Sequence, residues 1–195
     1  MPPIPAYTAT DQMADQVRAM GLKGASAFGQ ATALAFRYVA GQSGTANIEA
    51  FFKLLDITAR DMMDYKPTMA TVHNACALIV EATRARNLGL DAARAEIIRR
   101  ADRYVNLSVR NVEALGKAGA NLVQDGQTIM MHSFSEGVMA VFTQARQSGK
   151  DFRVICTESR PLRESRAGVN RMTALGIPIT FVLDAAMASL VGSAD

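Results

Sequence analysis

The fold of this chain is decided by residues 125–184, which read DGQTIMMHSFSEGVMAVFTQARQSGKDFRVICTESRPLRESRAGVNRMTALGIPITFVLD. Short apolar runs rich in β-formers alternate there with longer runs of helical composition. A strand–helix–strand–helix–strand order with apolar strands is typical of a parallel sheet with right-handed crossovers. The strands are predicted at 128–132, 152–157 and 179–183, and the helices at 136–147 and 166–175.

The chain before residue 125 has a different character, because its apolar residues recur at helical spacing. Residues 26–40 are crowded with Ala and Gly, so this helix should pack closely on a neighbour. The helices are predicted at 11–20, 26–40, 46–65 and 69–88, followed by a long one from Asp91.

These two patterns give an α/β fold class: an N-terminal all-helical domain, residues 1–124, followed by a Rossmann-like parallel-sheet domain, residues 125–195. Three strands make a small sheet, and the third is followed closely by Asp195. We therefore expect that only the N-terminal portion of the Rossmann-like domain is present, in truncated form.

Composition narrows the protein class. Of the 195 residues, 49% are hydrophobic and 20% are charged, which is enough for a packed core and argues against long disordered tracts. The N-terminal MPPIPAYTAT lacks the charged and apolar parts of a signal peptide, and no run of about 18 residues is apolar enough to span a bilayer. We expect a soluble cytoplasmic protein without a membrane partner.

Metal and nucleic-acid sites are disfavoured. The two cysteines, Cys76 and Cys156, are 80 residues apart without metal-type spacing, so we expect free buried thiols, no metal and no cofactor. The net charge is only +3, although residues 84–117 carry eight basic and four acidic side chains. These are either solvated helix faces or basic residues around an anion site. Nucleic acid is a poor third choice, since no basic run is interleaved with aromatics.

Ligands of open parallel sheets bind outside the carboxyl ends of the strands. This rule selects three loops, and polar residues cluster in all three, whereas the loops at the opposite ends look like plain turns. The selected loops are 132–137, 157–161 and 184–186. We predict one polar ligand site where they meet.

The first of these loops suits a phosphate, because it offers hydroxyls and the backbone N–H groups of a helix start. Ser135 either contacts that phosphate or merely caps the helix, and the two roles are compatible. His132 is either an acid or base, or a hydrogen-bonded structural histidine. In the other two loops, Arg160 either forks onto phosphate or pairs with a carboxylate such as Glu158. Asp184 either binds a ligand hydroxyl or caps the next helix.

The helical part adds weaker candidates for substrate binding. Lys23 and Gly24 lie in a loop between two predicted helices, which is either an anion site or an ordinary turn. Lys66 precedes Pro67 at a predicted helix start, where its positive charge opposes the helix macrodipole and so hints at a bound anion.

Five segments, in order along essentially the whole chain, resemble a known superfamily. MGLKGASAFG resembles its M-x-(V/I)-R-G-A loop, and KPTMATVHNA resembles R-P-T-A-V-x-L-x-N-A. DGQTIMMHSFS resembles D-G-x-x-I-L-T-H-C-x-(T/S), VICTESRPL resembles V-x-x-x-E-(T/S)-R-P-L, and GIPITFVLDAAMASLV resembles G-I-P-V-T-x-(I/V)-x-D-x-A-A. The superfamily comprises methylthioribose-1-phosphate isomerase, archaeal ribose-1,5-bisphosphate isomerase, and the α, β and δ regulatory subunits of translation initiation factor 2B.

Several positions depart from the enzymes of this superfamily. Their cysteine falls at Ser133, whose hydroxyl barely ionises near neutral pH, and lysine replaces their arginine at Lys23 and Lys66. The lysines keep the charge but lose the bidentate fork. The enzymes' essential aspartate lies in a G-A-D segment beyond Asp195. Phe134-Ser135 looks more like the regulatory β subunit.

The resemblance implies a ribose-1-phosphate-type sugar-phosphate binding protein of the aldose–ketose isomerase superfamily, with isomerase activity left open. Ser133 and His132 are then the catalytic candidates. The implied partner is a small phosphorylated sugar or nucleotide, and family members usually form a homo-oligomer, a dimer, when full length. The alternative is a non-catalytic regulatory or sensing subunit of the initiation factor 2B type.

Overall fold

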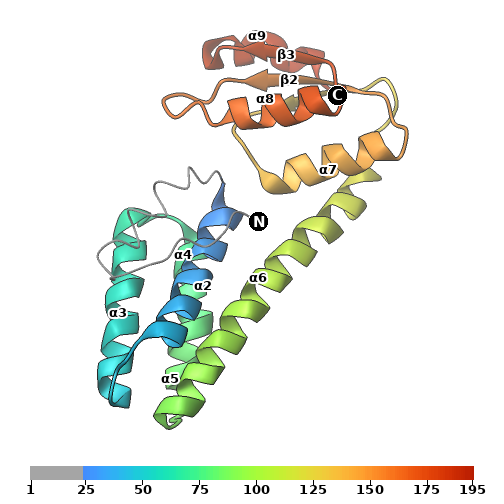
Figure 1. Cartoon of the computed structure of the whole chain (residues 1–195). Coiled ribbons are helices and arrows are strands. Elements are labelled where there is room, and N and C mark those ends of the chain that lie inside the picture. The colour runs from blue at the N-terminus through green and yellow to red at the C-terminus, as the bar shows by residue number, and fades with distance from the viewer. Residues whose placement is uncertain (1–23) are drawn as a thin grey trace. The chain divides into compact units, whose positions relative to one another are not determined.

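The structure is a computed structural model that describes residues 24–195. Contacts divide the described residues into two compact units that meet between Ser108 and Val109, inside helix α6 (Leu90–Ala120). In Figure 1 the chain can be followed from the helical unit along α6 into the α/β unit. The domain boundary placed after residue 124 stays a prediction.

The helical unit is built from several helices around one core. Its largest fully buried side chains include Phe36, Phe51, Leu55, Ile79 and Ile97. The helices predicted at 26–40, at 46–65 and from Asp91 are confirmed to within two residues, whereas the one at 11–20 lies outside the described residues. Before α6, the elements are α2 (Ala25–Gln42), α3 (Ile48–Tyr65), α4 (Ala70–Ala75), the π-helix η2 (Cys76–Glu81) and α5 (Ala82–Arg84).

Local sequence explains where α3 begins and which face it buries. The Asn47 side chain accepts the Ala50 N–H at 2.8 Å, as an N-cap residue does. The apolar residues that recur at helical spacing in α3 are buried or half-buried, namely Ile48, Phe51, Phe52, Leu55 and Met62.

The segment 69–88, predicted as one helix, differs in the structure. It contains a π-helical stretch from Cys76 to Glu81 between α4 and α5. A π-turn adds a residue to the helical repeat without changing residue types, so a pattern based on 3.6 residues per turn could not predict it.

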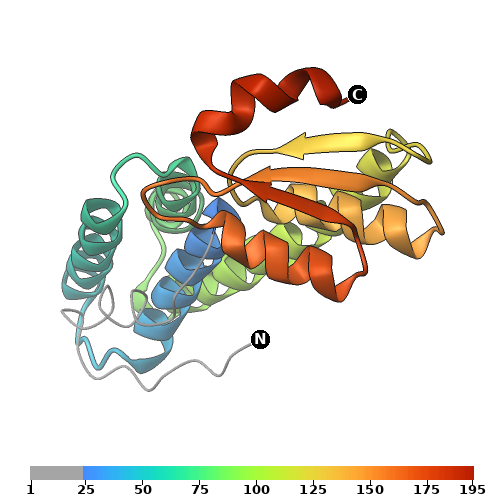
Figure 2. The same cartoon turned by 90° about the horizontal axis from the view of Figure 1, so that it is seen from above.

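The α/β unit has the predicted fold class. Strands β1 (Thr128–Met131), β2 (Arg153–Thr157) and β3 (Ile179–Val182) are parallel and lie in the order β1-β2-β3. The crossovers α7 (Glu136–Gln147) and α8 (Ser165–Ala174) both lie where they were predicted. Figure 2 shows the three strands side by side with these helices against the sheet.

The core of this unit lies between the sheet and its two crossover helices. Met139 and Phe142 of α7 and Met172 of α8 are buried against Val154 and Cys156 of β2. After β3 follow η3 (Asp184–Ala186), α9 (Met187–Leu190) and η4 (Val191–Ser193). All three loops selected from the sequence therefore lie at the same end of the sheet.

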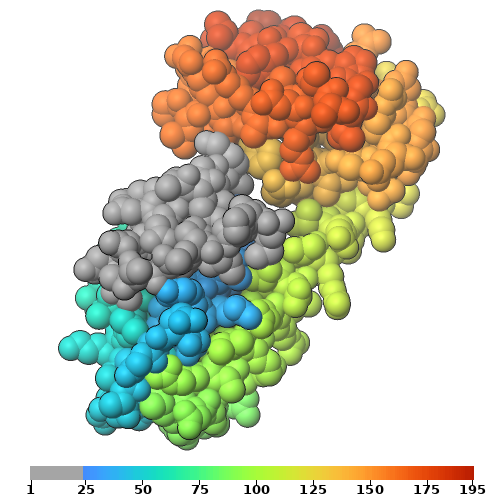
Figure 3. Space-filling view, in the orientation of Figure 1, coloured from blue at the N-terminus to red at the C-terminus, as the bar shows by residue number. Residues whose placement is uncertain are grey.

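The surface of α6 carries apolar side chains. Leu107, Val109 and Leu115 are exposed on it, and Figure 3 shows α6 in yellow-green at the surface. No helix among residues 24–195 is long and apolar enough to cross a membrane.

Candidate functional site

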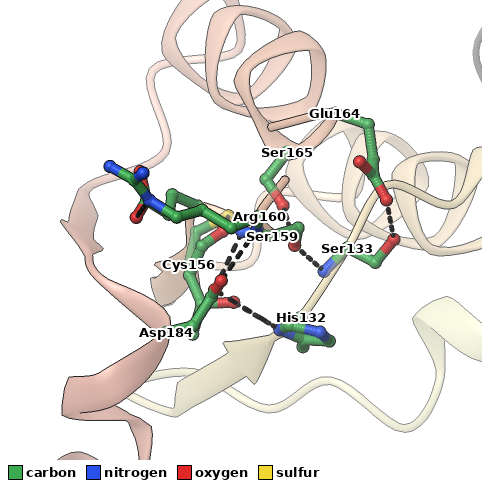
Figure 4. A network of polar contacts seen from close by, with 10 residues as sticks. His132, Ser133, Cys156, Ser159, Arg160, Glu164, Ser165 and Asp184 are labelled. Atoms are coloured by element: carbon green, nitrogen blue, oxygen red, sulfur yellow. Dashed lines mark hydrogen bonds and ion pairs between the residues drawn. The ribbon is translucent and has the colours of Figure 1, made fainter. Parts of the chain in front are cut away.

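Hydrogen bonds join the three strand-end loops into one polar network, shown in Figure 4. We use the name strand-end site for its side chains, which come from all three loops and from the start of α8. They are His132, Ser133, Ser159, Arg160, Glu164 and Asp184.

Asp184 joins the third loop to the second. Its Oδ1 accepts the backbone N–H of Ser159, and its Oδ2 accepts that of Arg160, both at 2.8 Å. These hydrogen bonds lower the pKa of the carboxyl below its ordinary value of 3.8, and the Thr157 hydroxyl and His132 act in the same direction. Asp184 is therefore an anionic clamp on the second loop, a role that was not among those considered from the sequence.

Ser133 joins the first loop to the second. Its φ of 68° is left-handed, a conformation that non-glycine residues adopt only where their surroundings hold it. Its N–H donates to Ser159 Oγ at 2.7 Å, and its own Oγ donates to Glu164 Oε1 at 2.9 Å. Ser159 Oγ also lies 2.7 Å from the Oγ of buried Ser165. Backbone and side chain of Ser133 are both held by hydrogen bonds.

His132 follows β1 directly and is half-exposed. Its Nδ1 lies 2.6 Å from Thr157 Oγ1 and 3.9 Å from Asp184 Oδ1. The Thr157 hydroxyl can donate to Nδ1 or accept from it, so the tautomer of the ring decides the direction of this hydrogen bond. The network thus satisfies the structural role of His132 while leaving one ring nitrogen for a ligand.

Arg160 forms an ion pair with Glu158, which is one of the two roles predicted for it. The Glu158 carboxylate is only 9% exposed and also lies 3.8 Å from Arg163, whereas the Arg160 side chain is 57% exposed. The planar guanidinium has five N–H donors, so the ion pair leaves several of them for an anion.

Ser135 caps α7, since its Oγ accepts the Val138 N–H at 3.4 Å. This confirms the capping role. The N–H groups of the first helical turn have no partner within the helix, so a phosphate can bind there as well.

The candidates in the helical unit have other surroundings. Lys23 lies outside the described residues, and Gly24 is the N-cap of α2 with a φ of 81°. The prediction that Lys66 stands at a helix start is wrong. It is the C-cap of α3, and α4 begins only at Ala70. Its charge is favourable at a helix C-terminus, so the argument for an anion from an opposing macrodipole falls. Its Nζ lies 5.0 Å from the centre of the Phe28 ring.

Residue patterns missed part of the site. Glu164 lies outside every predicted loop, and Ser159 lies inside one but had no assigned role.

Both cysteines are free and buried as expected, and burial raises the pKa of Cys76 to about 11 and that of Cys156 above its ordinary value. Within residues 24–195, no group of three or more His, Cys, Asp or Glu side chains could hold a metal ion.

The family model described as "Initiation factor 2 subunit family" matches residues 21–195. A ribose 1,5-bisphosphate isomerase of Methanocaldococcus jannaschii is 28% identical over 181 residues, which cover 93% of this chain and 57% of that protein. The chain thus spans little more than half the length of this curated relative.

Two solved structures from Pyrococcus horikoshii have the same fold. Translation initiation factor eIF-2B has a TM-score of 0.77 and 24% identity, covering 98% of this chain and 64% of that one. A 5-methylthioribose 1-phosphate isomerase has a TM-score of 0.73 and 19% identity, covering 96% and 55%. Both likenesses support the helical unit followed by a Rossmann-like sheet.

Proposed function

The chain belongs to the initiation factor 2 subunit family, and on that premise we propose that its strand-end site binds a sugar phosphate of the ribose 1-phosphate type. The observation that carries the proposal is the joining of all three strand-end loops by Asp184, Ser159 and Ser133 into one polar site. Such a site lies where parallel sheets bind ligands, and the relative from M. jannaschii is named for a ribose bisphosphate.

The phosphate is proposed to lie at the start of α7, against the free N–H groups beside Ser135 and the exposed guanidinium of Arg160. The sugar would then face Ser133 and His132. Lys23, Gly24 and Lys66 of the helical segment stay candidates for substrate binding, on the resemblance alone.

The finer proposal is turnover, an aldose–ketose isomerisation in which a proton moves between C1 and C2 of the opened sugar. His132 is the better acid or base of the two catalytic candidates, because imidazole can carry a proton in either direction where a serine hydroxyl cannot, and its Nδ1 is held by Thr157. Ser133 would accept a hydrogen bond from a sugar hydroxyl, because its own proton goes to Glu164.

A second candidate function is ligand sensing without turnover, in a regulatory subunit of the initiation factor type. The observation that favours it is the Ser133 side chain, which is a hydroxyl bonded to Glu164 and not an ionisable thiol. In either case the proposed assembly is a homodimer, which light scattering can check by its molar mass. The proposed location is the cytoplasm.

Calorimetry with ribose 1-phosphate and ribose 1,5-bisphosphate, and NMR detection of ketose, test both functions on the full chain. Binding with turnover that Ser133→Ala abolishes would make the hydroxyl part of the mechanism. Turnover that survives Ser133→Ala would leave an isomerase in which Ser133 has no chemical role.

Binding without turnover would favour the sensing subunit, and Ser133→Cys then asks whether a thiol alone restores activity. A wild-type chain that binds neither sugar phosphate would overturn the proposal.

A further inference from the structure

Glu164 has one carboxylate oxygen in use and one without a partner. Its Oε1 accepts the hydroxyl proton of Ser133 at 2.9 Å. Its Oε2 is buried and has no hydrogen-bond partner among residues 24–195. Figure 4 shows the carboxylate directed at Ser133, on the side of the network away from Asp184.

A buried carboxylate oxygen without a hydrogen bond costs stability, since the desolvation of that oxygen is not compensated. Glu164 stands directly before α8, where its negative charge is favourable, but that accounts for the charge and not for the unpaired oxygen. A hydrogen-bond donor from a ligand would therefore satisfy Glu164 Oε2.

The pairing with Glu164 also fixes what Ser133 can offer a ligand. A serine hydroxyl has one proton and two lone pairs, and the proton is used by Glu164. Towards a ligand, Ser133 Oγ can therefore only accept a hydrogen bond. The pair forms a site for a donor, such as a sugar hydroxyl.

The pair is held rigidly enough to discriminate. The Ser133 N–H is bonded to Ser159 Oγ, and Ser159 and Ser165 are both buried and lie within hydrogen-bond distance of each other. Ser165 follows Glu164 in the chain, so one set of hydrogen bonds positions both partners. Preorganised polar groups of this kind discriminate strongly against analogues that leave them unpaired.

We infer that Glu164, acting with Ser133, is a specificity-determining residue that selects a hydroxyl on the carbon next to the phosphate-bearing carbon of the ligand. This rests on the proposed function. In the proposed pose the phosphate lies at the start of α7 beside Ser135, two residues along the chain from Ser133, and the hydroxyl on C2 is assigned to Ser133. The ligand hydroxyl has one proton, which goes either to Ser133 Oγ or, because the carboxyl torsion of glutamate is broad, to the second oxygen of Glu164 after a small rotation.

The test compares the affinities for ribose 1-phosphate and 2-deoxyribose 1-phosphate by calorimetry on the full chain. Wild type, Glu164→Gln, Ser133→Ala and the double variant form a cycle, and Glu113→Gln on exposed α6 is the matched control. We expect wild type and the control to prefer the ribose form by about tenfold or more, and each single variant to lose most of that preference.

The double variant should lose no more than either single variant, because the two residues act on one hydroxyl. Should Glu164→Gln not fold, as judged by thermal unfolding, Ser133→Ala carries the same expectation. An unchanged preference in Glu164→Gln, or a wild type that binds both compounds equally, overturns the inference and leaves the proposed function standing. A wild type that binds neither compound overturns both.

Discussion

The carboxylate of Asp184 accepts the backbone N–H of Arg160 at 2.8 Å, so the first residue of η3, in the loop after β3, holds the loop that follows β2. Its other oxygen accepts the N–H of Ser159, which in turn accepts from Ser133 after β1. One carboxylate thus orients the backbone of all three strand-end loops, directly or through one intermediate.

Replacing Asp184 by Asn should therefore lower stability and loosen the site, because an amide has one acceptor oxygen where two are needed. The folded-state pKa of Asp184 lies below its ordinary 3.8, so its contribution is present above that pH and is lost as pH falls through the lower folded-state value. Urea midpoints of wild type and Asp184→Asn should differ at pH 7 and converge in acid. Equal midpoints at pH 7 would exclude the clamp.

Arg160→Ala should weaken the binding of ribose 1-phosphate at least about tenfold, the scale of a charge-assisted hydrogen bond of roughly 1.5–3 kcal/mol. Arg153→Ala is the matched control. Arg153 is also an exposed arginine, but it begins β2, whereas Arg160 lies in the loop that follows the other end of β2. Calorimetry should show less than about a twofold effect there. If both variants lost affinity equally, only net charge would matter and Arg160 would not contact the ligand.

In the helical unit, Glu96 is 7% exposed and pairs with Arg86, Arg99 and Arg100. Hydrogen bonds from these arginines, that from Arg99 foremost, lower the pKa of Glu96 from 4.5 to about 2. Glu96→Gln should cost about 2 kcal/mol of unfolding free energy at pH 7, a value reduced from that of a fully buried pair because the arginines are partly exposed.

The pH dependence of this loss has a definite sign. Because the folded-state pKa is depressed, the stabilisation by Glu96 is complete above about pH 4.5 and is lost as the pH falls towards about 2. Urea denaturation of wild type and Glu96→Gln should therefore give converging free energies between pH 5 and 2. A constant difference over that range would mean that the variant acts through packing and not through charge.

Gly29 marks the close approach of α2 to its neighbours. A Cβ there would lie 2.6 Å from Tyr104 Oη and 3.0 Å from Thr71 Cβ, and Tyr104 Oη donates to the Thr71 carbonyl. Gly29→Ala should cost about 1–3 kcal/mol by overpacking, and adding Tyr104→Phe should recover part of it.

The control is Gly41→Ala in the same helix, where a Cβ meets nothing within 4 Å. That change should be neutral or stabilise by up to about 1 kcal/mol, as alanine favours helix. Thermal unfolding of wild type and these three variants tests this, and a neutral Gly29→Ala would contradict the close packing.

The sequence by itself determined the element order, because periodicity and turn residues are local properties of the chain. The strands, both crossover helices, α2, α3 and the start of α6 lie within two residues of their predicted positions. The same local reasoning failed at two places. It missed the π-helix that begins at Cys76, and it put Lys66 at a helix start although Lys66 is the C-cap of α3.

The rule for open parallel sheets also selected the three loops of the strand-end site, and the sequence therefore determined where polar residues gather. It could not determine which of them contact one another. Ser133 and Glu164 are 31 residues apart in the sequence. Their hydrogen bond can form only because α7 crosses over to β2, and β2 brings the chain back beside the end of β1. Asp184 became a clamp, and not a helix cap, for the same reason. Hydrogen bonds between loops depend on the distance and angle of a few atoms, and only the tertiary structure fixes those.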